Sequence, residues 1–533
     1  MDTTAYLLRP HGGDGSDVLR GLTMPGALGY ALATRAAKPA VIQGGVSITW
    51  AQIAERTAAV ADRLQAAGVR PGDVIGVHLP NCWQFLVAHL ALAEIGAVLL
   101  PLHAPYRERE LATYLAFAEA RGAFVMSGAG EAKLAAIRDD LPFFALSIVV
   151  DVDAPADAFR YSGAIESSPL AASHVVTPDD PLALIPTSGT ESLKPKLCMH
   201  SHDGLLSNAV AFAESVQVGA DDRLVTGSGY THLFGMLGVH LALVRAATLI
   251  AVPVYSAAAY LDAAEAHGAT MAWAVPTQLT DLTAARERNA SHRLRLREVR
   301  TGGAPIAAEL GERVRALLCE NLVVHWGMSE LGGGITTTGL HLEPKLIGVP
   351  LPGAEARVVD HAGNPTAPGE TGDLLYRRAD MFRGYFRDEE TTAATMTADG
   401  WLRTGDLASR DAHGRIWYEG REKDLINRGG YKVSAYEIES MLGGLTAIRL
   451  AAVVCVPDDR MGEKGCLCVV LHAGETLALE EVAAHLDARG LAKYKWPEHL
   501  LVLDELPTTP TGKIWKKVLR EFAAERVRES VPS

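Results

Sequence analysis

The sequence predicts an α/β protein with a large N-terminal domain of layered α/β subdomains and a small, mobile α+β C-terminal domain. Three observations support this fold class. With 533 residues, the chain is too long for a single hydrophobic core. Short apolar runs typical of buried strands alternate with helical patterns over most of its length. After about Gly420 the pattern changes to a charged stretch followed by a short series of strands and helices.

The first strand–helix–strand unit follows the turn Pro71-Gly72-Asp73. We expect a strand at residues 74–79, a helix at 82–95 and a second strand at 98–102. The same alternation continues along the chain. It predicts further buried strands at residues 123–126, 147–151, 182–185, 270–275 and 322–325.

The C-terminal part reads as a separate domain of roughly a hundred residues. We place the large domain at residues 1–420, a hinge at 421–425 and the small domain at 426–533. Expected elements of the small domain are a helix from about Tyr436, strands at 451–456 and 466–472, a helix at 479–489 and a Lys/Arg-rich helix after Gly512. A small mobile domain behind a hinge suits an enzyme with two chemical steps.

Composition excludes several classes of protein. The formal net charge of −13 argues against a general attraction to nucleic acid. Two apolar stretches, 85–102 and 236–254, are interrupted by charged or histidine side chains, such as Glu94 and Arg245. One charge near the middle of a spanning helix costs about 3 kcal/mol. We therefore expect buried helix plus strand at both stretches, and no membrane partner.

The cysteines and the termini indicate a cytoplasmic protein. Six cysteines in a chain of this length form no CxxC pair and no disulfide framework, which points to a reducing compartment. The N-terminal segment has neither the basic start nor the apolar run of a signal peptide. The sequence leaves the oligomeric state open, a homodimer included.

The most informative segment is the loop between residues 184 and 196, Leu-Ile-Pro-Thr-Ser-Gly-Thr-Glu-Ser-Leu-Lys-Pro-Lys. An expected strand runs into small hydroxyl residues around Gly189, lysines follow, and a helix begins near Asp203. Hydroxyl and backbone N–H groups can surround phosphate oxygens, and glycine allows close approach. The spacing differs from a Walker A loop. Taken alone, the segment fits a solvated Ser/Thr turn equally well.

This loop resembles the phosphate loop of the adenylate-forming superfamily, which includes acyl-CoA synthetases, aryl-acid ligases, adenylation domains and beetle luciferases. The usual pattern is T-S-G-T-T-G-x-P-K; here Glu191-Ser192 replaces Thr-Gly and one extra residue precedes Pro195. The departure leaves Lys194 and Lys196 as alternatives for the loop lysine. The resemblance implies nucleotide contacts from five residues and a Mg²⁺ contact from the fourth of them: Thr187, Ser188, Gly189, Thr190 and Lys196.

Three further segments match the superfamily in order. Tyr230-Thr-His-Leu-Phe-Gly235 is similar to its F-H-x-x-G segment, which implies that His232 lies near the substrate carboxylate. Thr301-Gly-Gly-Ala-Pro305 resembles the turn that packs against adenine. His325-Trp-Gly-Met-Ser-Glu330 is similar to Y-G-x-T-E. By these matches Trp326 stacks on the adenine or borders the acyl pocket. The resemblance implies nucleotide contacts on the adenine side from Gly302, Gly303, Ala304, His325, Trp326 and Gly327.

The resemblance assigns the remaining roles one by one. Ser329 faces the AMP phosphate, and Glu330 acts in catalysis by helping to hold Mg²⁺. Trp401-Leu-Arg-Thr-Gly-Asp406 matches Y-x-T-G-D, whose Asp406 binds the ribose hydroxyls. Residues 420–430 match G-R-x-K-D-x-I-x-x-G-G, which makes Arg421 a second ribose ligand and Lys423 the hinge.

Two matches concern the second step and the catalytic lysine. Gly429 and Gly430, with Lys432 beside them, would let the pantetheine arm of coenzyme A pass close to the backbone. Pro510-Thr-Gly-Lys513 matches the terminal P-x-G-K segment, whose lysine assists adenylation. The resemblance covers almost the whole chain, from about Ile48-Thr49-Trp50 onward.

The chemistry of adenylation agrees with these assignments. A carboxylate attacking the α-phosphate of ATP brings two anions together, so the site needs positive charge. Mg²⁺ at Glu330, the Lys513 ammonium and loop N–H groups can supply it. Taken singly, Asp406 fits a turn, Trp326 a core residue and Lys513 one charge of a basic helix. The ordered set favours the functional interpretation.

The acid is expected to lack an α-amino group. Residues 230–235 contain no acidic side chain to pair a substrate ammonium, which would be costly to bury unpaired. An apolar pocket indicates an aryl, alicyclic or medium-chain acid. The candidates for its lining are Trp273, Val275, Gly302, Met328, Gly332, Gly333 and Gly334.

Coenzyme A is the expected acceptor. A carrier protein, whose prosthetic group shares the pantetheine arm, and a nitrogen nucleophile stay as alternatives. A luciferase-like oxygenase finds no support in the residues. A non-catalytic nucleotide sensor would be expected to lose Lys513 or Glu330, and both are present. His200 and His202 lack partners for a metal site and are expected to be structural.

Overall fold

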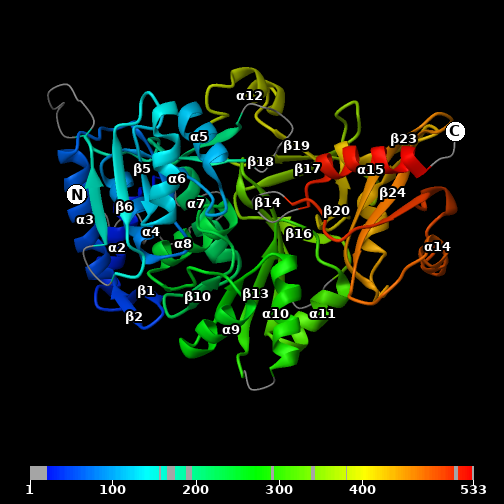
Figure 1. The fold of residues 1–533 in the computed structure, drawn as a ribbon, viewed down its shortest axis with the longest axis horizontal. Coiled ribbons are helices and arrows are strands. Elements are labelled where there is room, and N and C mark those ends of the chain that lie inside the picture. The colour runs from blue at the N-terminus through cyan, green and yellow to red at the C-terminus, as the bar shows by residue number, and fades with distance from the viewer. Residues whose placement is uncertain are drawn as a thin grey trace.

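The computed structural model describes residues 21–154, 158–164, 174–187, 195–289, 293–337, 343–379, 381–508 and 514–530. Within these residues the strands form three sheets, two in a large N-terminal domain and one in a smaller C-terminal domain (Figure 1). The chain therefore has the mixed α/β architecture that the sequence predicts.

The first sheet is mainly parallel, in the order β7-β6-β5-β3-β4-β8-β9, with antiparallel pairs at both edges. Helices α5 (Glu108–Phe117) and α6 (Ala129–Ile137) cover one face, where their leucines pack on the strands. The strands are β3 (Val74–His78), β4 (Val98–Pro101), β5 (Gly122–Met126), β6 (Leu146–Val150), β7 (Phe159–Ser162), β8 (Pro181–Pro186) and β9 (Leu197–Ser201).

The second sheet runs β17-β18-β19-β20-β16-β15-β14-β13-β12-β10-β11-β1-β2. The neighbouring strands β14, β13, β12, β10, β11 and β1 are parallel. On the far side of β14, the sheet continues with antiparallel pairs, such as β14 with β15 and β18 with β17. The strands are β1 (Pro39–Gln43), β2 (Val46–Thr49), β10 (Arg223–Thr226), β11 (Thr248–Ala251), β12 (Met271–Trp273), β13 (Leu296–Gly302), β14 (Cys319–Met328), β15 (Gly332–Thr336), β16 (Leu346–Pro350), β17 (Glu355–Val359), β18 (Gly372–Arg377), β19 (Leu402–Arg410) and β20 (Ile416–Arg421).

The largest hydrophobic core lies between these two sheets. It is built around α4 (Trp83–Glu94) and α8 (Leu233–Arg245), which are buried on almost every side because nearly every residue in them is apolar. The same core also contains residues of α2 (Met24–Arg35), α3 (Trp50–Ala66) and α7 (His202–Ser215). The outer face of the second sheet carries α9 (Ala257–Ala266), α10 (Pro276–Arg288) and α11 (Ala308–Leu317).

The two long apolar stretches are thus buried helix plus strand, as predicted: α4 with β4, and α8 with β11. Across the described residues, we find no helix with the length and apolar character needed to cross a membrane.

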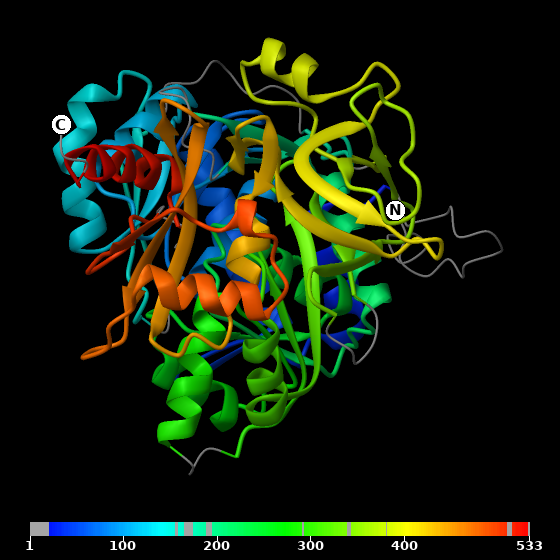
Figure 2. The same cartoon turned by 90° about the vertical axis from the view of Figure 1, so that its right-hand side faces the viewer.

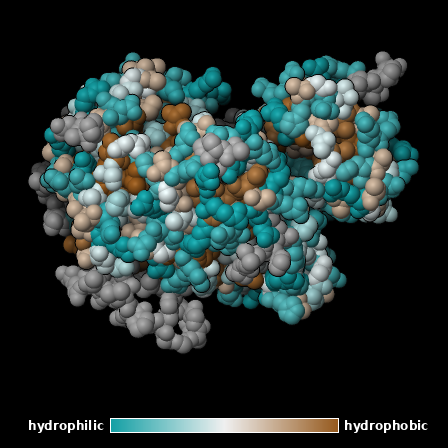
Figure 3. Space-filling model, turned by 90° about the horizontal axis from the view of Figure 1, so that it is seen from below, coloured by the Kyte–Doolittle hydropathy of each residue, from teal (hydrophilic) through white to brown (hydrophobic). Residues whose placement is uncertain are grey.

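The C-terminal domain projects as a lobe from the larger body (Figure 3), and its sheet and helices face the viewer in Figure 2. Its sheet has the order β22-β21-β24-β23, with β25 paired to β24, and it buries apolar residues on both faces. The short helix α12 (Glu389–Thr395) belongs to the large domain. The elements of the lobe are β21 (Leu425–Arg428), β22 (Tyr431–Ser434), α13 (Ala435–Ser440), β23 (Ile448–Asp458), β24 (Gly462–Leu471), α14 (Leu479–Ala488), β25 (His499–Val502) and α15 (Lys516–Ser530).

Buried histidines make the central core sensitive to acid. His89 of α4 and His240 of α8 share a hydrogen bond between their Nε2 atoms, 3.0 Å apart, and both side chains are buried. One ring must donate and the other accept, so the accepting ring is neutral. Burial lowers the pKa of His240 to about 3 and that of His89 well below its usual value.

We expect the free energy of unfolding to fall as the pH drops below 6.5. The folded pKa values lie below those of the unfolded chain, so the unfolded state binds more protons there, at about 1 kcal/mol per histidine between pH 6.5 and 5.5. Urea unfolding at both pH values measures this. His240→Gln should reduce the pH dependence, whereas His361→Gln, which alters an exposed turn, should not. Equal pH dependence in wild type and His240→Gln would contradict the prediction.

Candidate active site

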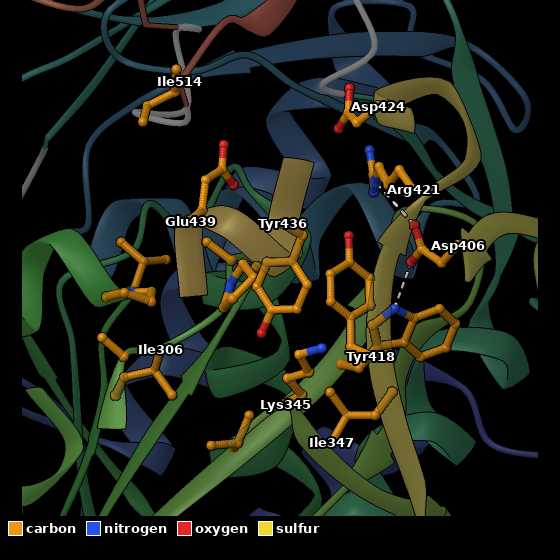
Figure 4. A pocket seen from close by; sticks show the side chains of 18 of the residues that line it. Ile306, Lys345, Ile347, Asp406, Tyr418, Arg421, Asp424, Tyr436, Glu439 and Ile514 are labelled. Atoms are coloured by element: carbon orange, nitrogen blue, oxygen red, sulfur yellow. Dashed lines mark hydrogen bonds and ion pairs between the residues drawn. The ribbon is translucent and has the colours of Figure 1, made fainter. Parts of the chain in front are cut away.

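A cavity of about 700 Å³ lies between the second sheet and the small domain (Figure 4). Its large-domain wall includes the ends of β13 and β14 and the start of α10, and its other wall includes α13 and α15. The cavity thus lies at the junction of the two domains. Predicted site residues on its wall are Gly303, Ala304, His325, Trp326, Gly327, Asp406, Arg421 and Lys423.

The Asp406 carboxylate is the best-defined group in this cavity. Asp406 and Arg421 are direct neighbours on the antiparallel strands β19 and β20, and Arg421 Nε donates to Asp406 Oδ1 at 2.9 Å. Trp326 Nε1 of β14 donates to Oδ2 at 2.7 Å. Only 3% of Asp406 is exposed, and its negative charge raises the pKa of Arg421 above the usual value. The carboxylate is therefore fixed by two donors, with lone pairs left for a ligand.

Glycines on β13 and β14 allow the close packing under this wall. A Cβ on Gly327 would lie 2.1 Å from the carbonyl oxygen of Gly332, and one on Gly302 would lie 2.4 Å from His325 Cδ2. Strand β14 therefore continues through Gly327 to Met328, beyond the predicted end at His325. On the other strand, β13 ends at Gly302. The next residue, Gly303, has a positive φ of 79° and turns the chain toward Ala304 at the cavity wall.

The other predicted acid-pocket glycines make room for side chains of the protein itself. A Cβ on Gly333 would lie 2.9 Å from the Phe212 ring, and one on Gly334 would lie 2.9 Å from the Trp326 ring. The carbonyl of Gly333 also accepts from Asn208 Nδ2 at 2.7 Å. The space that a side chain would occupy at Gly333 or Gly334 is thus taken by Phe212 and Trp326.

Glu330 forms a second polar centre, next to the base of the 187–196 loop. Tyr385 Oη donates to Glu330 Oε1 at 2.6 Å, and Lys196 Nζ lies 4.9 Å from the centre of the Tyr385 ring. Burial raises the pKa of Glu330, which the Tyr385 hydrogen bond and the Lys196 charge counteract. A single fixed carboxylate oxygen donor fits Mg²⁺, which takes one or two carboxylates and completes its shell with phosphates and water.

The ends of the predicted phosphate loop meet at this centre. Thr187 N donates to the carbonyl of Lys196 at 3.0 Å, directly beyond the antiparallel pair β8 and β9. Thr187 Oγ1 is buried and has no hydrogen-bond partner among the described residues. The hydroxyl is therefore available to an acceptor such as a phosphate oxygen. Ser188, Gly189 and Thr190 lie outside the described residues.

His232 and Ser329 both contact buried histidines. His232 caps α8, its Nδ1 accepting from Phe234 N at 3.3 Å, and its ring centre is 5.8 Å from that of His103. The carbonyl of Ser329 accepts from His200 Nε2 at 2.7 Å, and Met24 N donates to His202 Nδ1 at 3.1 Å. His200 and His202 therefore each form a hydrogen bond with the backbone, which agrees with the structural role that we expect for them.

The small domain closes the cavity with aromatic and charged side chains. The ring of Tyr436 on α13 lies 4.9 Å from that of Tyr418 on β20 of the large domain, in an edge arrangement. On α15, Lys516 Nζ lies 2.8 Å from Glu439 Oε1, and Arg520 Nη2 donates to the carbonyl of Lys423 at 3.1 Å. The last helix is therefore tied to the predicted hinge. Lys513 lies outside the described residues, but the next residue described, Ile514, is at the cavity.

Not every predicted ligand faces this cavity. Gly429, Gly430 and Lys432 lie on the β21–β22 hairpin and are absent from the described cavity wall. Sequence reasoning missed Tyr385, Tyr418, Tyr436 and Lys345, which carry no motif of their own. Lys345 lies on the wall, where its Nζ donates to Glu419 Oε2 at 2.9 Å. Among the described residues, no three His, Cys, Asp or Glu side chains are placed to hold a metal ion by themselves.

This arrangement suits a nucleotide. A buried carboxylate beside an arginine suits vicinal ribose hydroxyls, and an indole on the same wall can pack against a base. Thr187, Lys196 and Glu330 supply hydroxyl, cation and carboxylate for a phosphate–metal centre.

The comparison with known proteins agrees with this chemistry. Residues 30–386 match the family model described as AMP-binding enzyme, and residues 437–513 match that of its C-terminal domain. A Streptomyces salicylyl-CoA synthase / salicylate adenylyltransferase is 34% identical over 503 residues, 90% of each chain. A Mycobacterium tuberculosis salicyl-AMP ligase / salicyl-S-ArCP synthetase is 33% identical over 491 residues, 89% of this chain and 85% of the relative.

Solved structures show the same fold. ATP-bound MatB from Rhodopseudomonas palustris superimposes with a TM-score of 0.82 at 28% identity, covering 95% of this chain and 100% of that one. The fold, the nucleotide-type cavity and the match to both family models lead to one conclusion: this chain belongs to the AMP-binding enzyme family, within the adenylate-forming superfamily.

Proposed function

We propose that this enzyme uses ATP to activate a carboxylic acid without an α-amino group and transfers the acyl group to the thiol of coenzyme A. The observation that carries this proposal is the Asp406 carboxylate, held by Trp326 and Arg421 on the wall of the cavity between the domains. In this proposal Asp406 accepts from the ribose hydroxyls, and Arg421 adds donors beside them.

The phosphates are assigned to the centre formed by Thr187, Lys196 and Glu330. Lys196 is the stronger candidate for the loop lysine, because its ammonium lies over the ring that donates to Glu330. Mg²⁺ bound at Glu330, with Thr190 as a second ligand, would supply positive charge to the phosphates. In the first step a carboxylate oxygen of the acid forms a bond to the α-phosphorus, and the bond to the departing pyrophosphate breaks.

His232 is assigned to orient the substrate carboxylate, since it lies at the N-terminus of α8, where N–H groups favour an anion. In the second step the thiol sulfur attacks the acyl carbon. The bond between that carbon and the AMP oxygen breaks, AMP leaves, and the thiol proton passes to solvent.

Tyr385→Phe should shift the pH dependence of the first step. The Tyr385 hydroxyl lowers the pKa of Glu330, so its removal raises that pKa further and makes the carboxylate ionise at a higher pH. We expect the acid limb of the pH profile for pyrophosphate release, at limiting Mg²⁺, to move to higher pH. Tyr260→Phe, which loses a buried hydroxyl that donates to the Val225 carbonyl, is the control. An unmoved acid limb would exclude Glu330 from the metal site.

The second step is proposed to require rotation of the small domain. In the structure α15 faces the cavity, whereas the β21–β22 hairpin with Gly429 and Gly430 does not. We assign this arrangement to adenylation. Rotation within a hinge at residues 421–425, centred on Lys423, would exchange α15 for the hairpin, with residues 1–420 and 426–533 moving as units.

An aryl, alicyclic or medium-chain acid is the proposed substrate class. Tyr230 and Phe234 are buried, and the segment between them carries no acidic side chain. The Streptomyces relative is named for a CoA product of an aryl acid, which supports coenzyme A as acceptor. The M. tuberculosis relative is named for transfer to a carrier protein, which keeps that acceptor as the second candidate. The free cysteines support a cytoplasmic location.

Pyrophosphate release across an acid library, with and without coenzyme A, tests the proposal. Release with an aryl acid, followed by a CoA-dependent thioester, is the expected result. Release without any CoA-dependent product would replace coenzyme A by a carrier protein or a nitrogen nucleophile. Absence of release with every acid would refute adenylation.

A further inference from the structure

Arg300, in the middle of β13, is fully buried, with 0% of its side chain exposed. Its neighbours in the parallel sheet are Trp273 on β12 and Val323 on β14. Its guanidinium lies on the face covered by α7, close to Phe212. Arginine is almost never fully buried unless it is paired, so its surroundings require an explanation.

The guanidinium is held on three sides. Nη2 donates to Glu298, whose other oxygen accepts from Asn321 Nδ2 at 3.0 Å. Its Cζ lies 4.8 Å from the centre of the Phe212 ring and 5.4 Å from that of Trp273. Two aromatic rings therefore pack near the guanidinium, and one of its nitrogens pairs with a carboxylate.

Two other N–H-bearing nitrogens of the guanidinium lack hydrogen-bond acceptors among the described residues. Arg300 Nε and Nη1 are buried and have no hydrogen-bond acceptor among the described residues. Buried donors are almost always paired, and a charged donor left unpaired is expensive. An acceptor supplied by a bound molecule would complete this group.

His325 connects Arg300 to the cavity. The His325 ring lies 4.8 Å from that of Phe212 and 4.9 Å from that of Phe234, which follows His232 at the start of α8. His325 Nδ1 is also buried and without a partner among the described residues. Burial and the Arg300 charge lower the pKa of His325 to about 3, so its ring is neutral. A continuous row of packed side chains thus runs from His232 through Phe234, His325 and Phe212 to Arg300.

We infer that Arg300 is a specificity-determining residue that receives a second, neutral oxygen acceptor, a carbonyl or hydroxyl, borne by the acid. This inference rests on the proposed function. The acid's carboxylate lies near His232, and the acceptor lies farther along this row of side chains, in the plane of the guanidinium. Glu298 already neutralises the guanidinium, so a second carboxylate would place two anions around one buried cation.

Matched acids test the inference through kcat/KM for pyrophosphate release. Each pair shares its shape and differs in one group, such as hydroxyl against methyl or ketone against methylene, at varied positions of an aryl or alicyclic acid. For one position we expect the wild type to prefer the oxygen-bearing acid by about 100-fold or more. Arg300→Met should reduce this preference to about 3-fold or less by slowing the oxygen-bearing acid, and Arg300→Lys should keep part of it.

Arg297→Met is the control on the same strand. Its guanidinium pairs with Asp222 at 2.8 Å near the surface, so the preference should be unchanged. Thermal melting of each variant tests folding, and if Arg300→Met does not fold, the wild-type preference and Arg300→Lys decide. No preference at any position, a preference for a dicarboxylic acid, or equal losses for both members of a pair in a folded variant would overturn the inference. Absence of pyrophosphate release with every acid would instead refute the proposed function.

Discussion

Asp406→Asn is expected to lower kcat/KM for ATP by about 100-fold or more while the protein stays folded. The carboxylate accepts from Trp326 Nε1 and from Arg421 Nε, one donor on each oxygen. An asparagine of the same shape must turn its NH₂ group toward one of these donors. That contact sets donor against donor in a site that is only 3% exposed, and it removes an acceptor from the ribose.

Pyrophosphate release at varied ATP concentration measures the effect, with thermal melting as the test of folding. Asp411→Asn is a matched control, because Asp411 also accepts from an arginine, at 2.8 Å from Arg415 Nε, in a turn outside the cavity wall. It should leave the kinetics unchanged. A folded Asp406→Asn enzyme with normal affinity for ATP would show that the nucleotide binds elsewhere.

Much of the fold could be predicted because its central elements are short apolar runs with clear ends. The run at residues 82–95 became α4, and the one at 98–102 became β4. Such segments have few ways to bury themselves, so local pattern and tertiary structure agree. The end of β14 was harder to predict. The strand passes His325 because Gly327 lets the backbone approach Gly332, a contact between residues that only the folded pairing of β14 and β15 brings together.

The candidate site was predictable in its residue types and not in its pairings. The resemblance placed Trp326, Asp406 and Arg421 at a nucleotide, but the hydrogen bond between Trp326 and Asp406 joins residues 80 positions apart. Tyr385, which fixes Glu330, lies in no motif and was missed. Such contacts depend on the packing of two strands or loops and leave no periodic trace in the sequence.

The burial of Arg300 could not be predicted from the sequence either. In the sequence it is one charge in a basic segment that begins at Arg293. Only the alternation of β13, which turns Val299 to the outer helices and Arg300 to α7, places its guanidinium beside Phe212 in the core. A shift of one residue in that strand would have put the charge on the opposite face.

Lys513→Ala should slow adenylation by about 100-fold or more and change thioester formation from supplied acyl-AMP far less. Lys513 lies outside the described residues, but Ile514 and Trp515 are on the cavity wall. Two cations that follow on α15 are already paired, Lys516 with Glu439 and Arg520 with Asp424 at 3.7 Å. Both of these charges are already paired within the chain, which favours another residue, Lys513, as the cation for the phosphates.

The two half-reactions separate this role from a general loss of charge. Pyrophosphate release measures the first, and AMP release from acyl-AMP and coenzyme A measures the second. Lys493→Ala, which removes an exposed lysine from the same domain, should affect neither. Rotation of the small domain would carry Lys513 away before the thiol attacks, so the lysine can stabilise only the first transition state. Equal losses in both half-reactions would mean that Lys513 does not leave the site between the steps, and the two-conformation mechanism would then be wrong.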